Sequence, residues 1–165
     1  MAIRKLEVIA PPDKPTITTR RVLDAPRTLI FDVFTKPEHL QRWLGPRALT
    51  WVVCESDLRV GGGYRWVQRG PDGQEYTFHG TFKEIARPER IVRTFVFEAF
   101  WDDEALETLT LEERGGKTTA TTLTVHKTIR ARDAHLASGR MEAGMTEGYE
   151  RLDGLLGELQ SRARA

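Results

Sequence analysis

The sequence predicts a single α+β domain, in which a curved antiparallel sheet of seven strands packs against a long C-terminal helix. Residues 50–127 consist of short runs rich in Val, Thr, Tyr, Phe and Trp, separated by turn residues, which is typical of an antiparallel meander. The last 25 or so residues carry an apolar stripe with helical period. The 165 residues, 39% hydrophobic and 30% charged, have the size and composition of one globular domain.

The N-terminal part of the chain predicts an arm, a strand and two short helices. We expect residues 1–14 to form an N-terminal arm, in which Leu6–Ile9 has the composition of a short strand, and residues 15–163 to form the domain. The first firm strand is Thr16–Leu23, which is rich in β-branched residues. A helix over Pro26–Thr35 follows, because Pro suits the first turn and apolar residues recur at spacings of three and four. A second short helix begins near Pro37 and ends at the Gly-Pro pair that follows Leu44.

Six further strands complete the predicted sheet. In several of them apolar residues alternate with polar ones, as in Tyr64 and Trp66, or in Phe78 and Phe82, so one sheet face is apolar and the other polar. In strand 50–57 both parities carry apolar residues, so its inward face is not assigned. The strands are predicted at 50–57, 63–69, 74–85, 90–99, 104–113 and 117–127.

The C-terminal part predicts a short helix at 131–137 and a long helix from residue 138 or 139 to 162. Its apolar face consists of Met141, Met145, Leu152, Leu155, Leu156 and Leu159, with Tyr149 at the edge. Gly144 and Gly148 lie on or near that face, although Gly costs about 1 kcal/mol relative to Ala inside a helix. Either sheet rings pack closely against the glycines, or a cavity lies where they face Trp66 and Phe78. We expect the cavity.

Several function classes are disfavoured. A net charge of +1 provides no basic face for nucleic acid, and no apolar run approaches the length of a membrane span, about 20 residues. The start of the chain lacks the apolar core of a signal peptide, and a lone cysteine, Cys54, suits a reducing compartment, so we expect a cytoplasmic protein. Gly61–Gly63 does not resemble a phosphate loop, so no cofactor is expected.

No catalytic or metal-binding motif is evident either. None of the three serines lies in a G-x-S-x-G elbow, and the four histidines lack metal-ligand spacing. Glu55 and Asp57 share one strand face and either form a solvated charged surface or act with Arg65 as polar anchors for a ligand. Glu107 and Gln68 are further candidates for such anchors.

Three segments carry a family resemblance: Arg59–Tyr64, Gly80–Arg90 and Ala131–Asp153. They resemble the START-like (SRPBCC) helix-grip superfamily, and more narrowly the bacterial domains similar to the C-terminal domain of the activator of the heat-shock-protein-90 ATPase. The resemblance covers about residues 15–160 and implies a helix-grip fold. It implies little about function, because the superfamily contains lipid carriers, hormone receptors, pollen allergens and polyketide cyclases. The activator has a separate N-terminal domain that makes much of the chaperone contact, so we do not carry its co-chaperone role over.

The leading hypothesis is a protein that binds a small hydrophobic molecule in an apolar cavity between the sheet and the C-terminal helix. The expected lining is Trp43, Tyr64, Trp66, Phe78, Phe95, Phe97, Leu109, Met141, Met145, Gly148 and Tyr149. Trp43 either lines the pocket mouth or closes one end of the core.

Two alternatives remain open. One is an enzyme of the cyclase or hydratase type on the same scaffold, which would require a polar or charged group that points into the cavity. The other is a chaperone-associated interaction module, for which the aromatic stretch 97–101, next to Asp102 and Asp103, is the candidate surface.

Overall fold

The structure, a computed structural model, describes residues 5–98, 103–137 and 140–164. The strands form a single antiparallel sheet in the order β1-β2-β8-β7-β6-β5-β4-β3. In chain order the elements are β1 (Glu7–Ile9), β2 (Thr16–Leu23), α1 (Arg27–Thr35), α2 (Pro37–Trp43), β3 (Thr50–Ser56), β4 (Gly63–Arg69), β5 (Glu75–Ala86), β6 (Arg90–Phe97), β7 (Glu104–Arg114), β8 (Lys117–Val125), α3 (Ile129–Ala137) and α4 (Arg140–Arg164).

The predicted fold class is confirmed, with one difference in the strand count. The sheet has eight strands, because Glu7–Ile9 in the expected N-terminal arm pairs with β2 as an edge strand. The pairing places Val8 opposite Thr19, so three residues suffice to extend the sheet by one strand. A three-residue run with two apolar residues carries too little alternation to be assigned firmly from sequence.

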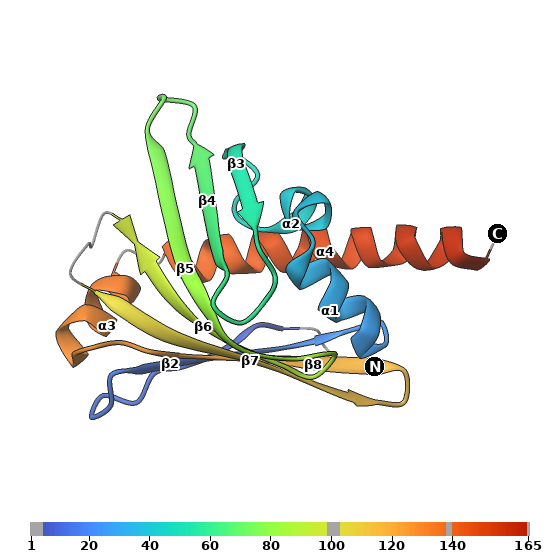
Figure 1. The fold of residues 1–165 in the computed structure, drawn as a ribbon, viewed down its shortest axis with the longest axis horizontal. Coiled ribbons are helices and arrows are strands. Elements are labelled where there is room, and N and C mark those ends of the chain that lie inside the picture. Colours follow the sequence, from blue (N-terminus) through green and yellow to red (C-terminus); the bar gives the residue numbers. More distant parts are fainter. Residues whose placement is uncertain (1–4, 99–102, 138–139, 165) are drawn as a thin grey trace.

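The sheet is strongly bent around α4. Figure 1 shows β3, β4 and β5 rising steeply from β2, β7 and β8, with α4 running through the angle between the two parts. Register shifts interrupt the β3–β4 pairing between Trp51 and Val53, and the β5–β6 pairing between Phe82 and Glu84. Such irregularities bend a strand and increase its twist. The concave face that results is the inner face of the sheet.

The core lies between this inner face and the helices. The largest fully buried side chains come from β2, α1, β7 and α4, and include Ile17, Phe31, Leu111, Leu152 and Leu156. Leu152 and Leu156 are one helical turn apart, which confirms that the apolar stripe of the last helix faces the interior.

Gly144 and Gly148 of α4 pack against the end of α2 and the turn that follows it. A Cβ on Gly148 would lie 3.0 Å from the carbonyl oxygen of Trp43 and 3.4 Å from the amide nitrogen of Gly45, and a Cβ on Gly144 would lie 3.5 Å from Pro46. The expectation that these glycines face Trp66 and Phe78 is therefore wrong. Their missing side chains allow the turn backbone to approach the helix closely, instead of leaving room beside the sheet.

Polar contacts hold this turn on α4. The guanidinium of Arg151 donates a hydrogen bond of 3.3 Å to the carbonyl oxygen of Gly45, and the amide of Arg47 donates one of 2.8 Å to the carboxylate of Glu147. The ring of Trp43 stacks on Tyr149 at a centroid distance of 5.7 Å. Trp43 thus closes one end of the core, next to the helix.

Candidate functional site

Five predicted ring side chains share the inner face of three neighbouring strands. Trp66 of β4 pairs with Phe78 of β5, which pairs with Phe97 of β6. Tyr64 and Phe95 are two residues along their strands and therefore point to the same face. The rings are in contact, with centroid distances of 4.7 Å for Tyr64–Trp66, 4.8 Å for Phe78–Phe97 and 5.6 Å for Phe78–Phe95. Because Trp66 and Phe78 are paired residues, these rings form one aromatic surface on the inner face of the sheet.

Gly80 on β5 leaves room for the ring of Tyr64 to lie over that strand. Tyr64 and Gly80 are paired residues, and the Tyr64 hydroxyl donates a buried hydrogen bond of 2.6 Å to the carbonyl oxygen of Thr94 on the next strand. A Cβ at Gly80 would lie 1.9 Å from that oxygen and 2.6 Å from the hydroxyl. Glycine in a strand interior often marks such a close approach.

A buried ion pair lies beside these rings. Both Nε and Nη2 of Arg93 donate to Oε1 of Glu107, at 2.8 and 2.6 Å, and the two side chains are only 16% and 13% exposed. The guanidinium carbon lies 4.9 Å from the ring centroids of both Tyr64 and Trp66. Arg93 and Glu107 are paired residues on β6 and β7, so the register of the sheet brings them together.

Arg93 stays protonated in this pair. Burial by itself lowers the pKa of Arg93, but the carboxylate of Glu107 and the nearby Tyr64 together outweigh this effect, and the net pKa is raised above its usual value. Burial also raises the pKa of Tyr64; Arg93 has a smaller lowering effect on that pKa, and Glu107 a smaller raising effect. The Tyr64 hydroxyl therefore remains a hydrogen-bond donor at neutral pH.

Trp66 leaves a polar atom unpaired in this cluster. Its side chain is buried, and among the described residues its indole Nε1 has no hydrogen-bond partner. Trp51 shows the same feature on β3, whereas the Nε1 of Trp43 donates to the carbonyl oxygen of Val33 at 2.9 Å. Because buried indole N–H groups usually find an acceptor, the Trp66 donor requires an explanation.

Helix α4 covers the far side of the cluster. Burial raises the pKa of Tyr149, and the carboxylate of Glu107 contributes to the same shift. A second buried cation, Arg21 of β2, donates to Asp153 of α4 at 2.6 and 3.2 Å. Each inward-facing cation of this region thus has a carboxylate partner.

The remaining predicted lining residues are distributed around the cluster. Leu109 is buried on β7, two residues from Glu107 on the same face, and Met145 packs against the core from α4. Met141 is half-buried in the first turn of α4. Trp43 and Gly148 belong to the contact between α2 and α4, apart from the sheet rings.

A chain of polar side chains adjoins the aromatic surface at its α3 end. The Nδ1 of His126 lies 2.7 Å from Oδ2 of Asp103, and its Nε2 lies 3.1 Å from Nδ1 of His135. The ring of His135 stacks on Phe95 at a centroid distance of 6.3 Å. Asp103, His126, His135, Phe95, Phe97 and Ala131 line a cavity of about 20 Å³.

This cavity is small because the rings pack against one another. A volume of about 20 Å³ is room for a single water molecule. Tyr64 and Trp66 are buried and Phe78, Phe95 and Phe97 are half-buried, so little of the aromatic surface is free in this structure. A larger molecule could reach it only if a covering element moved.

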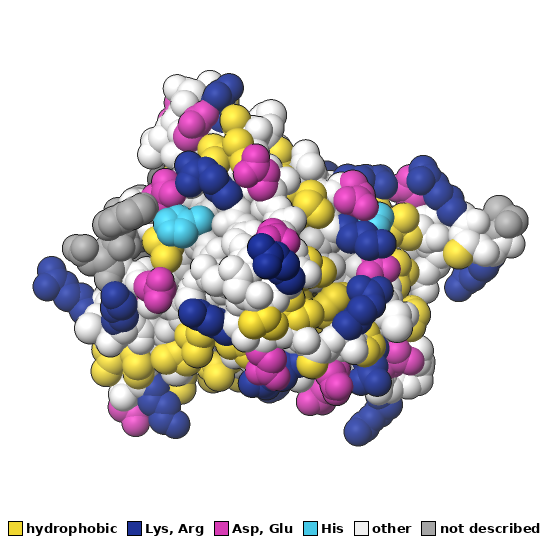
Figure 2. All heavy atoms as spheres, viewed as in Figure 1, with side chains coloured by type: hydrophobic (Ala, Val, Ile, Leu, Met, Phe, Trp, Pro, Cys, Tyr) yellow, Lys and Arg dark blue, Asp and Glu magenta, His cyan; other side chains and the backbone are white. Residues whose placement is uncertain are grey.

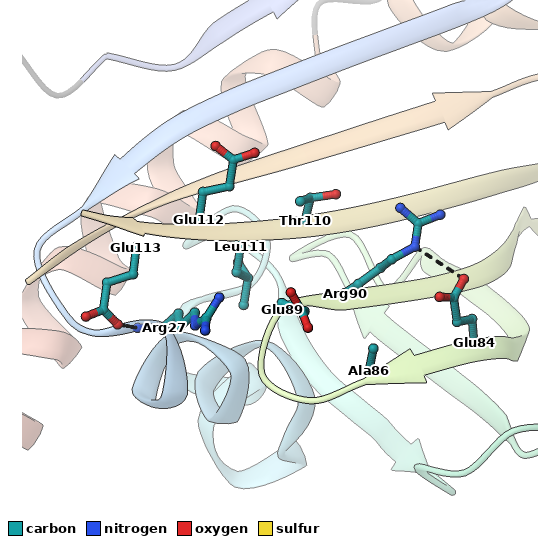
Figure 3. Close-up of a pocket in the computed structure, with 9 residues that line it drawn as sticks. All are labelled: Arg27, Glu84, Ala86, Glu89, Arg90, Thr110, Leu111, Glu112 and Glu113. Carbon is teal, nitrogen blue, oxygen red and sulfur yellow. Dashed lines mark hydrogen bonds and ion pairs between the residues drawn. The ribbon is translucent and has the colours of Figure 1, made fainter.

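A larger, polar cleft lies at the opposite end of β5, β6 and β7. Figure 3 shows its lining, which encloses about 530 Å³ and includes Arg27, Glu84, Arg90, Leu111 and Glu113. Two contacts join its lining residues: Arg90 lies 3.2 Å from Glu84, and the backbone amide of Arg27 donates to Glu113 at 2.8 Å. These contacts hold the start of α1 and the turn between β5 and β6 in place. We assign the cleft no chemistry.

The outer sheet face also carries apolar side chains. Leu106, Leu123 and Val125 are 42%, 37% and 37% exposed, and Figure 2 shows hydrophobic side chains along the lower side of the molecule, where β2, β7 and β8 run in Figure 1. Only the ends of the stretch considered as an interaction surface are described. Phe97 faces inward and stacks on Phe78, Asp103 bonds to His126, and residues 99–102 lie outside the described residues.

Of the polar anchors considered from sequence, Glu107 and Gln68 face inward. Gln68 is buried and donates to the carbonyl oxygen of Leu44 at 3.1 Å. Glu55 is exposed on the outer face, opposite Arg65, so this carboxylate belongs to the solvated surface. Arg93 and the three residues of the His126 chain were missed. Arg93 could have been recognised from the sequence, because it is a charged residue at a position of β6 that alternation assigns to the apolar face.

None of the helices in the described part of the chain is both long and apolar enough to cross a membrane. A search among curated proteins finds no match. Solved structures do match. A protein of Rhodobacter sphaeroides is 28% identical with a TM-score of 0.86, over 94% of this chain and 99% of that one. A Mycobacterium smegmatis protein is 26% identical with a TM-score of 0.81, over 92% and 97% of the two chains.

A third solved structure, from Chromobacterium violaceum, is 26% identical with a TM-score of 0.73, over 85% of this chain and 96% of that one. The family model described as activator of Hsp90 ATPase homolog 1-like protein matches residues 24–157, which include α1 through most of α4. The fold of this family is generally a scaffold for binding ligands. Sequence and fold together show that the chain belongs to the activator of Hsp90 ATPase homolog 1-like family, within the START-like superfamily.

Proposed function

We propose that the protein binds a small, neutral and mainly apolar molecule that carries a carbonyl or hydroxyl oxygen, between the inner sheet face and α4. The observation that carries the proposal is the unpaired indole Nε1 of Trp66, buried in the aromatic surface beside the Arg93–Glu107 pair. Apolar walls with a few placed polar groups are characteristic of small-molecule sites.

The charges of the site favour a neutral ligand. Arg93 is compensated by Glu107 and Arg21 by Asp153, so neither of these two inward-facing cations is left without a carboxylate partner. An anionic ligand would bring a charge into this interior without a free cation to meet it, which is costly. A carbonyl oxygen, in contrast, needs only a donor such as the Trp66 N–H.

Helix α3 is the covering element best suited to move. Its only buried residue is Arg132, whose guanidinium donates to the carbonyl oxygens of Pro11 and Lys14 at 2.6 and 2.9 Å. A helix held by polar contacts, with little apolar burial, opens at lower free energy than the core helices. It also lines the small cavity, through Ala131 and His135. We infer that ligands enter at this end.

Equilibrium dialysis with two ligands of the same skeleton tests the proposal. 2-Acetylnaphthalene is neutral and carries a carbonyl, and 2-naphthoate is its anionic counterpart. We expect saturable binding of the ketone with a stoichiometry near one, and at least about tenfold weaker binding of the carboxylate, which corresponds to about 1.4 kcal/mol. Equal affinities, or no saturable binding of the ketone, would contradict the proposal.

Two matched variants locate the site. Ala131 lines the cavity from α3, whereas Ala134 of the same helix is exposed. Ala131→Phe should weaken ketone binding at least about tenfold, because the ring occupies the entrance, and Ala134→Phe should leave it unchanged.

The enzyme alternative needs a group that exchanges a proton with the bound molecule. Arg93 does not supply one, because its pKa is raised and its hydrogen bonds go to Oε1 of Glu107. The Arg93–Glu107 pair by itself therefore supports binding and orientation of a ligand, not proton transfer to it.

A further inference from the structure

Asp103, His126 and His135 form a hydrogen-bonded series, called here the Asp103–His126–His135 chain, in which His126 bonds to both of the others. Asp103 precedes β7, His126 follows β8, and His135 lies on α3, so three separate elements place the three groups in line. Among the described residues no three His, Cys, Asp or Glu side chains are placed to hold a metal ion. The arrangement is a hydrogen-bonded series rather than a ligand set.

A carboxylate acceptor at one end of the series is compatible with one pair of tautomers for two neutral rings. An ionised Asp103 can only accept, so Nδ1 of His126 carries the proton that it donates at 2.7 Å. With both rings neutral, Nε2 of His126 is then an acceptor, and Nδ1 of His135 donates to it at 3.1 Å. Nε2 of His135 is consequently left with its lone pair, and no hydrogen bond from the described residues reaches it.

His135 places this nitrogen at the aromatic surface. Its ring is half-buried, stacks on Phe95, and lines the same small cavity as Phe95 and Phe97. A molecule bound against these rings, with α3 beside it, would be within reach of the ring. The position combines an apolar surrounding with a single unpaired basic nitrogen.

We propose that His135 is a general base that removes a proton from a molecule bound in the interior, with Asp103 and His126 as positioning residues. The inference rests on the proposed binding function. The substrate class is a neutral apolar carbonyl compound with an acidic C–H next to the carbonyl. The C–H bond breaks, its electron pair forms an enolate, and the proton passes to Nε2 of His135. Return of that proton to the same carbon regenerates His135 and the ketone; where a C=C bond adjoins that carbon, the enolate is a dienolate, and return of the proton to its far carbon moves the double bond, with no further reactant.

The surroundings of His135 keep it ready to accept a proton near neutral pH. Burial lowers its pKa below 6.5, and a protonated His126 would lower it further, whereas the carboxylates of Glu107 and Asp103 raise it. Because the net pKa is lowered, the ring is neutral at pH 7 and its lone pair is available. The nearby carboxylates would stabilise the imidazolium that forms during proton transfer.

The elimination of 5-nitrobenzisoxazole tests for a base of this kind. A base removes the proton on C3, the electron pair forms a nitrile, and the N–O bond breaks to release a coloured phenolate, so no other reactant is needed. We expect the protein to exceed the same concentration of imidazole by at least about 100-fold at pH 7. His135→Phe, which retains a ring on Phe95, should lose this rate, and His79→Gln on the outer face should keep it. A wild-type rate no higher than that of imidazole, or an unchanged rate in His135→Phe, would overturn the proposal.

The positioning role has its own readout. The rate should rise with pH through a single midpoint below 6.5 and then stay constant. Asp103→Asn should lower the plateau and move the midpoint to lower pH, because the carboxylate raises the pKa of His135, and Asp103→Glu should restore both. A lower plateau with an unmoved midpoint would assign Asp103 a structural role only. Imidazole nitrogen NMR should show Nδ1–H on both rings, and Nε2–H on His135 would contradict the chain.

Binding of 2-acetylnaphthalene separates this inference from the function on which it rests. Ketone binding by the wild type, together with a wild-type elimination rate that His135→Phe loses, supports both. Ketone binding by the wild type without elimination refutes the base alone. Absence of both refutes the binding site and the base together.

Discussion

The hydroxyl of Tyr64 donates a 2.6 Å hydrogen bond to the carbonyl oxygen of Thr94, across the strand that separates them. The bond crosses β5 at Gly80, the one residue whose missing side chain leaves room for the ring. It fixes the orientation of Tyr64, and the Arg93 guanidinium lies over the same ring. The inner face is therefore held in place by backbone geometry as well as by packing.

Gly80→Ala should destabilise the protein strongly. The new Cβ would lie 1.9 Å from the Thr94 oxygen, and backbone atoms cannot move away without breaking the strand pairing. We expect a loss of at least about 3 kcal/mol in the free energy of unfolding, measured by urea denaturation. Gly154→Ala in α4 is the matched control: a Cβ there has open space, and the change should stabilise by up to about 1 kcal/mol.

Tyr64→Phe removes the hydroxyl but keeps the ring. Because the Thr94 oxygen loses a buried donor, we expect a loss of about 1–2 kcal/mol in stability. Tyr76→Phe, at a half-buried position on β5, should change stability by less than about 0.5 kcal/mol. Equal effects of the two changes would show that the Thr94 bond contributes nothing.

The Arg93–Glu107 pair predicts a non-additive double mutant. Arg93→Met or Glu107→Leu alone leaves one charge buried without its partner and should cost about 3–5 kcal/mol. The double variant removes both charges, so its cost should be smaller than that of either single change. Additive losses in urea denaturation would indicate that the two side chains act independently.

His135 predicts a loss of stability in acid. Its folded-state pKa lies below the unfolded value of 6.5, so the unfolded state binds the proton more readily. Stability from this group is present above pH 6.5 and declines as the pH falls through the folded-state pKa. Compared with the wild type, His135→Phe should show a shallower decrease of melting temperature between about pH 6.5 and 5. Parallel curves for the two proteins would contradict this assignment.

Much of the fold could be predicted because its signals are local. The β-branched runs, the turn glycines and the apolar stripe ending in Leu152 and Leu156 each specify an element by themselves. The family resemblance then supplied their arrangement. The edge strand at Glu7–Ile9 escaped firm assignment because three residues carry too little pattern.

The site was predicted only in part. Tyr64, Trp66 and Phe78 could be grouped because alternation assigns them to one sheet face, and Arg93 could have been found in the same way, as a charge among Ile91, Phe95 and Phe97. The glycines of α4 could not be placed, because a helical projection gives a direction but not the neighbour, which is the turn at Gly45. The Asp103–His126–His135 chain depends on the docking of α3, which no local pattern encodes.

The central claim is that the buried N–H of Trp66 meets the polar end of a neutral apolar ligand. The most direct test follows the indole N–H signals by ¹H–¹⁵N NMR while 2-acetylnaphthalene is added. The Trp66 proton should shift downfield as it gains an acceptor, whereas the Trp43 proton, already bonded to Val33, should stay in place. An unmoved Trp66 signal at saturating ketone would contradict the account.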